Sequence, residues 1–182
     1  MRIVGGKHGG RRLMMVGKQT TRATADMVKE AVFNMLGGTI SGVVLDLFAG
    51  NGAYGLEALS RGARFAYMID HDREAVSTII ANTKMLGEEK QASIQHKDYL
   101  RFLAGLGNDD LFDIVFLDPP YKMNVHANVI LELGPFIAKD GIIVCEMIRE
   151  NILPDEMGIF TKTKERYYGS KRVILYQRKQ DL

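Results

Sequence analysis

Cysteine, tryptophan and long apolar runs are scarce or absent in this chain of 182 residues. Its single cysteine, Cys145, cannot form an internal disulfide, which excludes a disulfide-dense scaffold and fits a reducing compartment. No apolar run approaches the roughly 20 residues that a membrane-spanning helix needs, and residues 1–6 show no apolar core of a secretory signal. We therefore expect a cytoplasmic protein that makes no membrane contact.

Metal ligands are also sparse, because the four histidines, His8, His71, His96 and His126, are scattered along the chain. We expect no metal ion. The composition, with 46% hydrophobic and 25% charged residues, is typical of a globular protein and excludes extensive disorder. A chain of this length forms one domain, or one domain with a small appendage.

The net charge of +2 conceals an uneven distribution. Residues 1–22 carry six basic residues and no acidic one, and residues 161–182 carry seven basic residues against Glu165 and Asp181. Since the two ends contribute +6 and +5, residues 23–160 carry −9. Two basic ends on a nearly neutral chain indicate either a localised face for a polyanion or solvated charge on surface strands.

Residues 1–16 predict a small hairpin, because two short runs with apolar residues flank a glycine-rich turn at residues 5–10. A helix follows, in which Val28, Val32 and Met35 recur with helical spacing. Thr24 is its expected N-cap, and the glycines at 37 and 38 end it. We assign residues 1–38 to an N-terminal hairpin-and-helix appendage and residues 39–182 to the main domain.

From residue 43 short apolar runs alternate with helical stretches, which predicts a mostly parallel sheet covered by helices on both faces. The last two strands flank a turn at residues 168–171 and predict an antiparallel hairpin. The expected fold is a doubly wound, Rossmann-like α/β domain with a seven-stranded sheet. The strands are expected at 43–47, 65–69, 92–95, 114–117, 141–145, 160–167 and 173–177, and the helices at 53–61, 72–86, 98–105 and 125–138.

A glycine-rich loop follows the first of these strands, with a G-x-G-x-x-G pattern at Gly50, Gly52 and Gly55. Glycine permits a tight turn and lets a ligand approach the backbone closely. The pattern alone is weak and fits either a dinucleotide or S-adenosylmethionine. Asp46 lies four residues before Gly50, and a carboxylate beside the loop suits a cationic ligand better than a pyrophosphate. We therefore favour S-adenosylmethionine over NAD.

Two more carboxylates end the next strands. Asp70 follows the second strand and is expected to accept hydrogen bonds from the ribose hydroxyls that both cofactors carry. Asp98 follows the third strand and has two interpretations, as an acceptor from the adenine amino group or as the cap of the next helix. Asp72 is expected to cap the helix that it precedes.

The most specific motif is Asp118-Pro119-Pro120-Tyr121, directly after the fourth strand, where open α/β sheets bind ligands. The prolines stiffen the chain, so that the Asp118 carboxylate and the Pro119 carbonyl form a fixed pair of acceptors. Two acceptors can hold both hydrogens of a nucleobase amino group and aim its lone pair at a sulfonium methyl group. Tyr121 would stack on the base.

These motifs resemble the class I methyltransferases that modify amino groups, and more closely the bacterial 16S rRNA guanine-N2 methyltransferases of the RsmD type. The resemblance covers nearly the whole chain, with Ala23 standing where that family usually has proline and Lys29 where arginine is commoner. Its motifs here are residues 2–7, 10–13, 22–26, 29–34, 45–52, 56–63, 118–121, 168–169 and 172–173.

The resemblance implies transfer of a methyl group to the exocyclic N2 of a guanine in small-subunit rRNA. The expected partner is this rRNA, with the assembling 30S particle favoured as its context and free RNA left open. The resemblance also implies that residues 118–121 are catalytic and that the cofactor is bound by Asp46, Gly50, Gly52, Asp70 and Asp98. We expect the cofactor site to include also Phe48, Asn51, Gly55, His71 and Tyr99. The basic ends are then expected to neutralise RNA phosphates without reading sequence. The expected RNA-binding residues are Arg2, Lys7, Arg11, Arg12, Arg22, Thr24, Lys171 and Arg172.

Three alternatives stay open from the sequence. The same Asp-Pro-Pro-Tyr motif serves a methyltransferase that acts on the N6 amine of adenine in DNA. An NAD-dependent oxidoreductase shares the glycine loop, although no catalytic His, Lys and Tyr constellation accompanies it. A non-catalytic RNA-binding module with a vestigial cavity would keep the basic ends alone.

Overall fold

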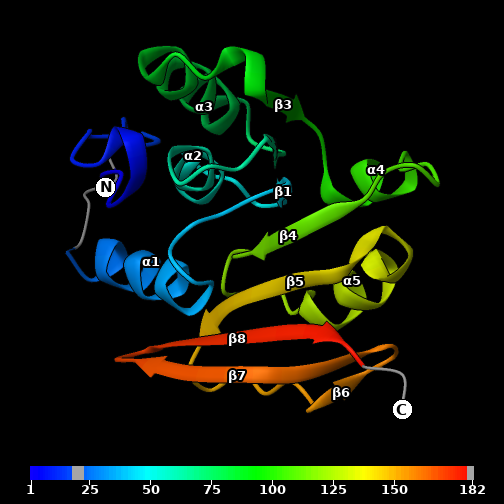
Figure 1. Cartoon of the computed structure of the whole chain (residues 1–182). Helices are drawn as coiled ribbons and strands as arrows, with labels where there is room; N and C mark the ends of the chain where they lie inside the picture. The colour runs from blue at the N-terminus through cyan, green and yellow to red at the C-terminus, as the bar shows by residue number, and fades with distance from the viewer. Residues whose placement is uncertain (18–22, 180–182) are drawn as a thin grey trace.

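The computed structural model describes residues 1–17 and 23–179. Its centre is one mixed sheet in the order β3-β2-β1-β4-β5-β8-β7-β6 (Figure 1). The first five strands of that order run parallel, and β8, β7 and β6 are each antiparallel to the preceding strand. The strands are β1 (Val43–Asp46), β2 (Phe65–Asp70), β3 (Ala92–His96), β4 (Phe112–Leu117), β5 (Ile137–Ile148), β6 (Glu156–Met157), β7 (Phe160–Tyr168) and β8 (Lys171–Arg178).

Helices cover both faces of this sheet. One hydrophobic cluster joins the sheet to the helices of one face, and a second cluster joins it to those of the other face. The first face carries α1 (Ala23–Met35), α2 (Ala53–Ser60) and α3 (Arg73–Leu86), and the second carries α4 (Tyr99–Ala104) and α5 (His126–Leu133) (Figure 1). Within residues 1–17 and 23–179, no helix is long and apolar enough to cross a membrane.

The doubly wound α/β fold is therefore confirmed, with small differences in extent. An eighth strand, β6, contains only two residues at the sheet edge. The helix expected at 125–138 ends at Leu133, because Pro135 cannot continue it and a short 3-10 turn, η3 (Gly134–Phe136), follows. Strand β5 consequently begins at Ile137 and is longer than expected at both ends.

Both ends of α3 follow their local sequence signals. The Asp72 carboxylate caps the helix by accepting the Glu74 N–H at 2.9 Å. At the other end Gly87 adopts a left-handed conformation with φ of 71°, which suits glycine. A second 3-10 turn, η2 (Glu89–Gln91), leads into β3.

The N-terminal segment, which we define as residues 1–17, is paired less regularly than a hairpin. It contains a single β-bridge, between Arg2 and Arg12, around the 3-10 turn η1 (Gly6–His8). Thr24 lies inside the first turn of α1 and is exposed, so it is not the expected cap; Arg22 lies outside the described residues. The division at residue 38 stays a prediction, although Ile3 and Leu13 share one hydrophobic cluster with α1 and α2.

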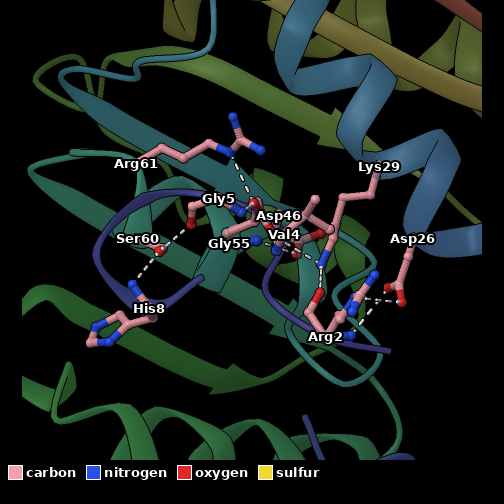
Figure 2. Close-up of polar contacts among 11 residues, drawn as sticks. Arg2, Val4, Gly5, His8, Asp26, Lys29, Asp46, Gly55, Ser60 and Arg61 are labelled. Atoms are coloured by element: carbon pink, nitrogen blue, oxygen red, sulfur yellow. Dashed lines mark hydrogen bonds and ion pairs between the residues drawn. The ribbon is translucent and has the colours of Figure 1, made fainter. Parts of the chain in front are cut away.

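A buried carboxylate fastens the N-terminal segment to the domain. Glu57 of α2 is 0% exposed, and its oxygens accept the N–H groups of Val4 and Gly5 at 2.8 Å each. It also pairs with Lys29 of α1 at 3.0 Å and with Arg61 at 2.8 Å. Figure 2 shows these donors converging from three parts of the chain. Since every oxygen is satisfied, the burial of this charge is offset only while all partners remain in place.

We expect Glu57→Ala to lower the free energy of unfolding by about 3–5 kcal/mol, because Lys29 would be left as an unpaired charge in the interior. Urea denaturation would measure the loss. The matched control is Glu30→Ala, an exposed glutamate in the same helix as Lys29, with an expected change within about 0.5 kcal/mol. A change in Glu57→Ala as small as that of the control would contradict a stabilising role for the cluster.

Candidate active site

A cavity of about 470 Å³ opens at the carboxyl ends of the parallel strands. Loops that follow β1, β2 and β4 line it together with the end of β5 and part of the N-terminal segment. This edge is where open α/β sheets bind ligands. Nine residues expected to bind a cofactor or to act in catalysis line the cavity, namely Phe48, Gly50, Asn51, Asp70, His71, Asp118, Pro119, Pro120 and Tyr121.

The three glycines of the loop after β1 have different roles. Gly50 has a φ of 57°, and a Cβ added to it would meet no protein atom within 4 Å, so the backbone faces open cavity space. Gly52 is the N-cap residue of α2 with a φ of 83°, and a Cβ there would lie 3.1 Å from Leu56 Cδ1. At Gly55 a Cβ would lie 2.6 Å from Met68 Cγ. Only the first glycine therefore lines the cavity, and the other two permit the turn and close helix–strand packing.

The Asp46 side chain lies behind the glycine-rich loop and holds it by a hydrogen bond. It is 2% exposed, does not line the cavity, and its Oδ2 accepts the Gly55 N–H at 3.0 Å. Burial raises the pKa of Asp46 to about 7, and the charge of Asp70 adds to the rise, although the Gly55 hydrogen bond opposes it. A positive charge in the nearby cavity would therefore favour the ionised form of Asp46.

Asp70 lines the cavity and holds two loops together. Its Oδ2 accepts the Gly50 N–H at 2.8 Å, and its Oδ1 accepts the Asp72 N–H at 2.9 Å. Each carboxylate oxygen retains a second lone pair that can accept from a ligand hydroxyl. The His71 side chain is exposed beside it, with Nδ1 3.6 Å from Asp70 Oδ1.

Asn51 connects the glycine loop to the N-terminal segment. Its Nδ2 donates to the Met14 carbonyl at 3.2 Å, and the buried Asn82 of α3 donates to both the Met14 and Asn51 carbonyls at 3.0 Å. Met1, Met15 and Val16 consequently form part of the cavity wall.

Asp98 and Tyr99 do not line the cavity. The Asp98 carboxylate caps α4 by accepting the Leu100 N–H at 2.9 Å, which supports the capping interpretation. The ring of Tyr99 packs on that of Phe48, with centroids 5.3 Å apart. Tyr99 therefore contacts the cavity only indirectly, by packing against Phe48, which lines it.

The Asp118–Tyr121 turn presents the expected acceptors. The Pro120 carbonyl accepts the Met123 N–H at 2.8 Å, which closes the turn, while no donor in the described ranges reaches the Pro119 carbonyl. Burial raises the pKa of Asp118 well above its ordinary value, and the nearby Glu146 raises it further, whereas Lys171 lowers it. The Tyr121 side chain is 67% exposed at the cavity mouth, with Lys122 Nζ 5.8 Å from its ring centroid.

Glu146 and Tyr54 were not assigned to the site from the sequence. Tyr54 of α2 lines the cavity, and its hydroxyl donates to Glu146 Oε2 at 2.6 Å. Lys171 lines the cavity too, with Nζ 3.0 Å from Glu146 Oε1. The position of Glu146 at the end of a strand beside β4 was the available signal, but its partners are 92 and 25 positions away along the chain.

The predicted RNA-binding residues divide into two groups. Arg2, Lys7, Arg11 and Arg12 are exposed on the N-terminal segment, where Lys7 also pairs with Glu88 at 2.6 Å. The structure contradicts such a role for Arg172, which is 7% exposed and whose guanidinium donates to Glu165 and to the Asn151 carbonyl. Lys171 lies in the cavity wall instead of on an outer phosphate-binding face.

Comparison with known proteins gives consistent similarities over nearly the whole chain. The family described as "Conserved hypothetical protein 95" matches residues 1–177. The YlbH protein of Bacillus subtilis is 38% identical over 98% of this chain and 100% of its own length. Ribosomal RNA small subunit methyltransferase D of Escherichia coli K12 is 36% identical over 98% of this chain and 90% of its own length. The solved structure of the yhhF protein of Escherichia coli superposes with a TM-score of 0.84 at 33% identity, covering 98% of this chain and 97% of that protein.

The buried Asp46 generates a prediction about stability and pH. Because its pKa rises from 3.8 to about 7, the folded protein holds this proton more tightly than the unfolded chain, and stability is lost as the pH rises between these values. Asp46→Asn removes this loss while retaining an acceptor for Gly55. We expect the variant to gain stability relative to the wild type from pH 4 to 7, by at most about 1.4 kcal/mol per pH unit.

Chemical denaturation at a series of pH values would measure this difference, with the exposed Asp109→Asn as the control for the same chemical change. A stability difference that stays constant over the window would contradict the raised pKa.

Proposed function

We propose, on the premise that this chain belongs to the family of RsmD-like methyltransferases, that it methylates the exocyclic N2 of a guanine in small-subunit rRNA with S-adenosylmethionine. The observation that carries the proposal is the half-buried Asp118 beside the Pro119 carbonyl, which no donor among the described residues engages, in the wall of a cavity that also holds the glycine loop and Asp70. We further propose that the substrate is an assembling 30S particle in the cytoplasm.

The residues present fit S-adenosylmethionine. Gly50 leaves room beside its backbone, and Asp70 retains acceptor capacity for a ribose at the end of β2. Burial and neighbouring carboxylates raise the pKa values of Asp46 and Asp118, so a nearby cation would stabilise their ionised forms; a ligand with a sulfonium and an ammonium supplies one, and a pyrophosphate does not. When bound, this cofactor supplies an electrophilic methyl group.

The chain's own contribution is to orient the amine. A guanine amino group is a weak nucleophile, because its lone pair is delocalised into the ring. The Asp118 carboxylate and the Pro119 carbonyl accept its two hydrogens and turn the lone pair out of the ring plane. With the cofactor bound, the methyl carbon would exchange its bond to sulfur, which keeps the electron pair, for a bond to the amine nitrogen; the Asp118 carboxylate would then take the proton that the cationic amine sheds. The exposed Tyr121 ring stacks on the base at the cavity mouth.

The exposed basic residues of the N-terminal segment provide the RNA face. The cavity is bordered by Met1, Met15 and Val16 of the same segment, so phosphates bound there lie near the mouth. Such contacts position folded RNA without reading its sequence. The target guanine must leave its stack to enter the cavity.

We expect Asp118→Ala to lower the rate of methyl transfer to small subunits by about 100- to 1,000-fold, because one of two fixed acceptors for the amine is lost. Binding of S-adenosylhomocysteine should persist, since Asp70 and Gly50 are unchanged. Labelled cofactor and purified 30S subunits would measure transfer, and mass spectrometry would identify the product as N2-methylguanosine.

The matched control is Asp109→Ala, in an exposed loop before β4, with wild-type activity expected. Labelling by the wild type of duplex DNA alone would favour the adenine alternative and overturn the proposal. RNA binding without any turnover would favour the non-catalytic module.

Salt dependence tests the RNA face separately. We expect Arg11→Ala and Arg12→Ala each to weaken RNA binding and to reduce the slope of log affinity against log salt concentration by about one, because each releases one counterion fewer. Lys139→Ala, an exposed residue at the amino end of β5, serves as the control and should leave the slope unchanged. A salt response that is flat for the wild type would remove the basic face from the proposal.

A further inference from the structure

A linked set of three side chains adjoins the proposed catalytic carboxylate. We define the Tyr54–Glu146–Lys171 triad by the Tyr54 hydroxyl that donates to Glu146 at 2.6 Å and the Lys171 ammonium that lies 3.0 Å from the other oxygen of Glu146. Its members come from α2, β5 and β8. Tyr54 and Lys171 line the same cavity as Asp118, while Glu146 is buried behind them.

The sheet fixes this arrangement. Glu146 of β5 is paired in register with Val173 of β8, and Ile148 with Lys171, so the antiparallel pair brings the ammonium back toward the carboxyl end of β5. Strand β5 is also the parallel neighbour of β4, which ends directly before Asp118. Lys171 is therefore held against the cavity by backbone pairing as well as by its ion pair.

We propose that the triad positions the Lys171 ammonium in the cavity wall that also holds Asp118, and that this positive charge favours the ionised form of the carboxylate, which accepts the hydrogens of the amine. The inference rests on the proposed function, since it concerns the charge state in which Asp118 acts. In this role Lys171 and Glu146 are positioning residues, because they act through Asp118.

The groups facing Asp118 explain why such help is needed. Glu146 at the end of β5 and Asp46 at the end of β1 both raise the pKa of Asp118, because each carboxylate opposes a further negative charge nearby. The Tyr54 hydroxyl from α2 points to Glu146, and His126 from α5 lies with its Nε2 3.1 Å from the Glu146 carbonyl. Burial lowers the pKa of His126, which keeps this imidazole neutral. Among these groups Lys171 is the cation.

Lys171 is in turn stabilised in its protonated form by the carboxylates of Asp118 and Glu146. Burial alone lowers the pKa of Lys171, but Asp118 and Glu146 outweigh it, so the net pKa is raised and the ammonium stays protonated. Glu146 thus has two effects, since it repels the charge of Asp118 directly and holds the cation that compensates for it. Replacement by glutamine removes the first effect while keeping an acceptor for Lys171.

Two variants are expected to shift the titration of Asp118 in opposite directions. Lys171→Met should raise the pH at which Asp118 ionises by roughly one to three pH units, the range for a nearby opposite charge. Glu146→Gln should lower it. In both variants the acid limb of the pH profile for single-turnover methyl transfer should move in the same direction as the pH at which Asp118 ionises. Lys171→Arg retains the charge and should restore the wild-type limb.

Carbon-13 NMR of aspartate carboxyl groups in the free protein would follow Asp118 directly, with its signal assigned by its loss in Asp118→Asn. Lys139→Met, which removes an exposed positive charge at the amino end of β5, is the control and should shift nothing. If Lys171→Met fails to fold, the same NMR titration is carried out on the other two variants, with Asp118 expected to ionise at the wild-type pH in Lys171→Arg and at a lower pH in Glu146→Gln.

An Asp118 titration that stays at the wild-type pH in Lys171→Met, or that rises in Glu146→Gln, would overturn the inference. Absence of methyl transfer by the wild type to 30S subunits would instead overturn the proposed function. The two failures are distinguishable, because the NMR titration requires no turnover.

Discussion

Three carboxylates gathered at the carboxyl ends of neighbouring strands are the constraint on which the site depends. Asp46 and Glu146, at the ends of β1 and β5, are buried, and Asp118, directly after β4 between them, is half-buried. Burying ionised groups is unfavourable unless hydrogen bonds or opposite charges compensate for it. The Gly55 N–H, the Tyr54 hydroxyl and the Lys171 ammonium supply part of that compensation. The remainder is available to a cationic ligand, so an unfavourable feature of the free protein favours binding in the proposed function.

The sheet makes this concentration of charge possible. Parallel strands all end at one edge, so carboxylates that are far apart in the sequence gather there without any contact between their own loops. The antiparallel strand β8 then returns along β5, so that its first residue, Lys171, lies at the carboxyl ends of the parallel strands. In a wholly parallel sheet the last strand would run the same way as the others, and its first residue would lie at their amino ends. The reversal at β8 is therefore what allows a cation near the start of a strand to face the acids.

The parts of the fold and site that local sequence determines were predictable. Alternating apolar runs, the glycine loop, the cap at Asp72 and the rigid turn at residues 118–121 depend on neighbouring residues, and the structure contains all of them. The remaining features depend on contacts between distant segments. Lys29 and Glu57 are charged residues on helices, which usually indicates a solvated face, yet they pair in the interior. Arg172 belongs to a basic pair, but in a strand successive side chains point to opposite faces.

The N-terminal segment connects the two halves of the proposed function. It is anchored at one end by Glu57, which accepts the N–H groups of Val4 and Gly5, and at the other by Asn82, which donates to Met14. Between these anchors it presents Lys7, Arg11 and Arg12 to solvent, and beyond them Met15 and Val16 line the cavity. Because one tethered segment provides both surfaces, the geometry of the cavity mouth and that of the basic face are fixed relative to each other. Two buried polar side chains, one from α2 and one from α3, thus determine how a bound polyanion would be oriented toward Asp118.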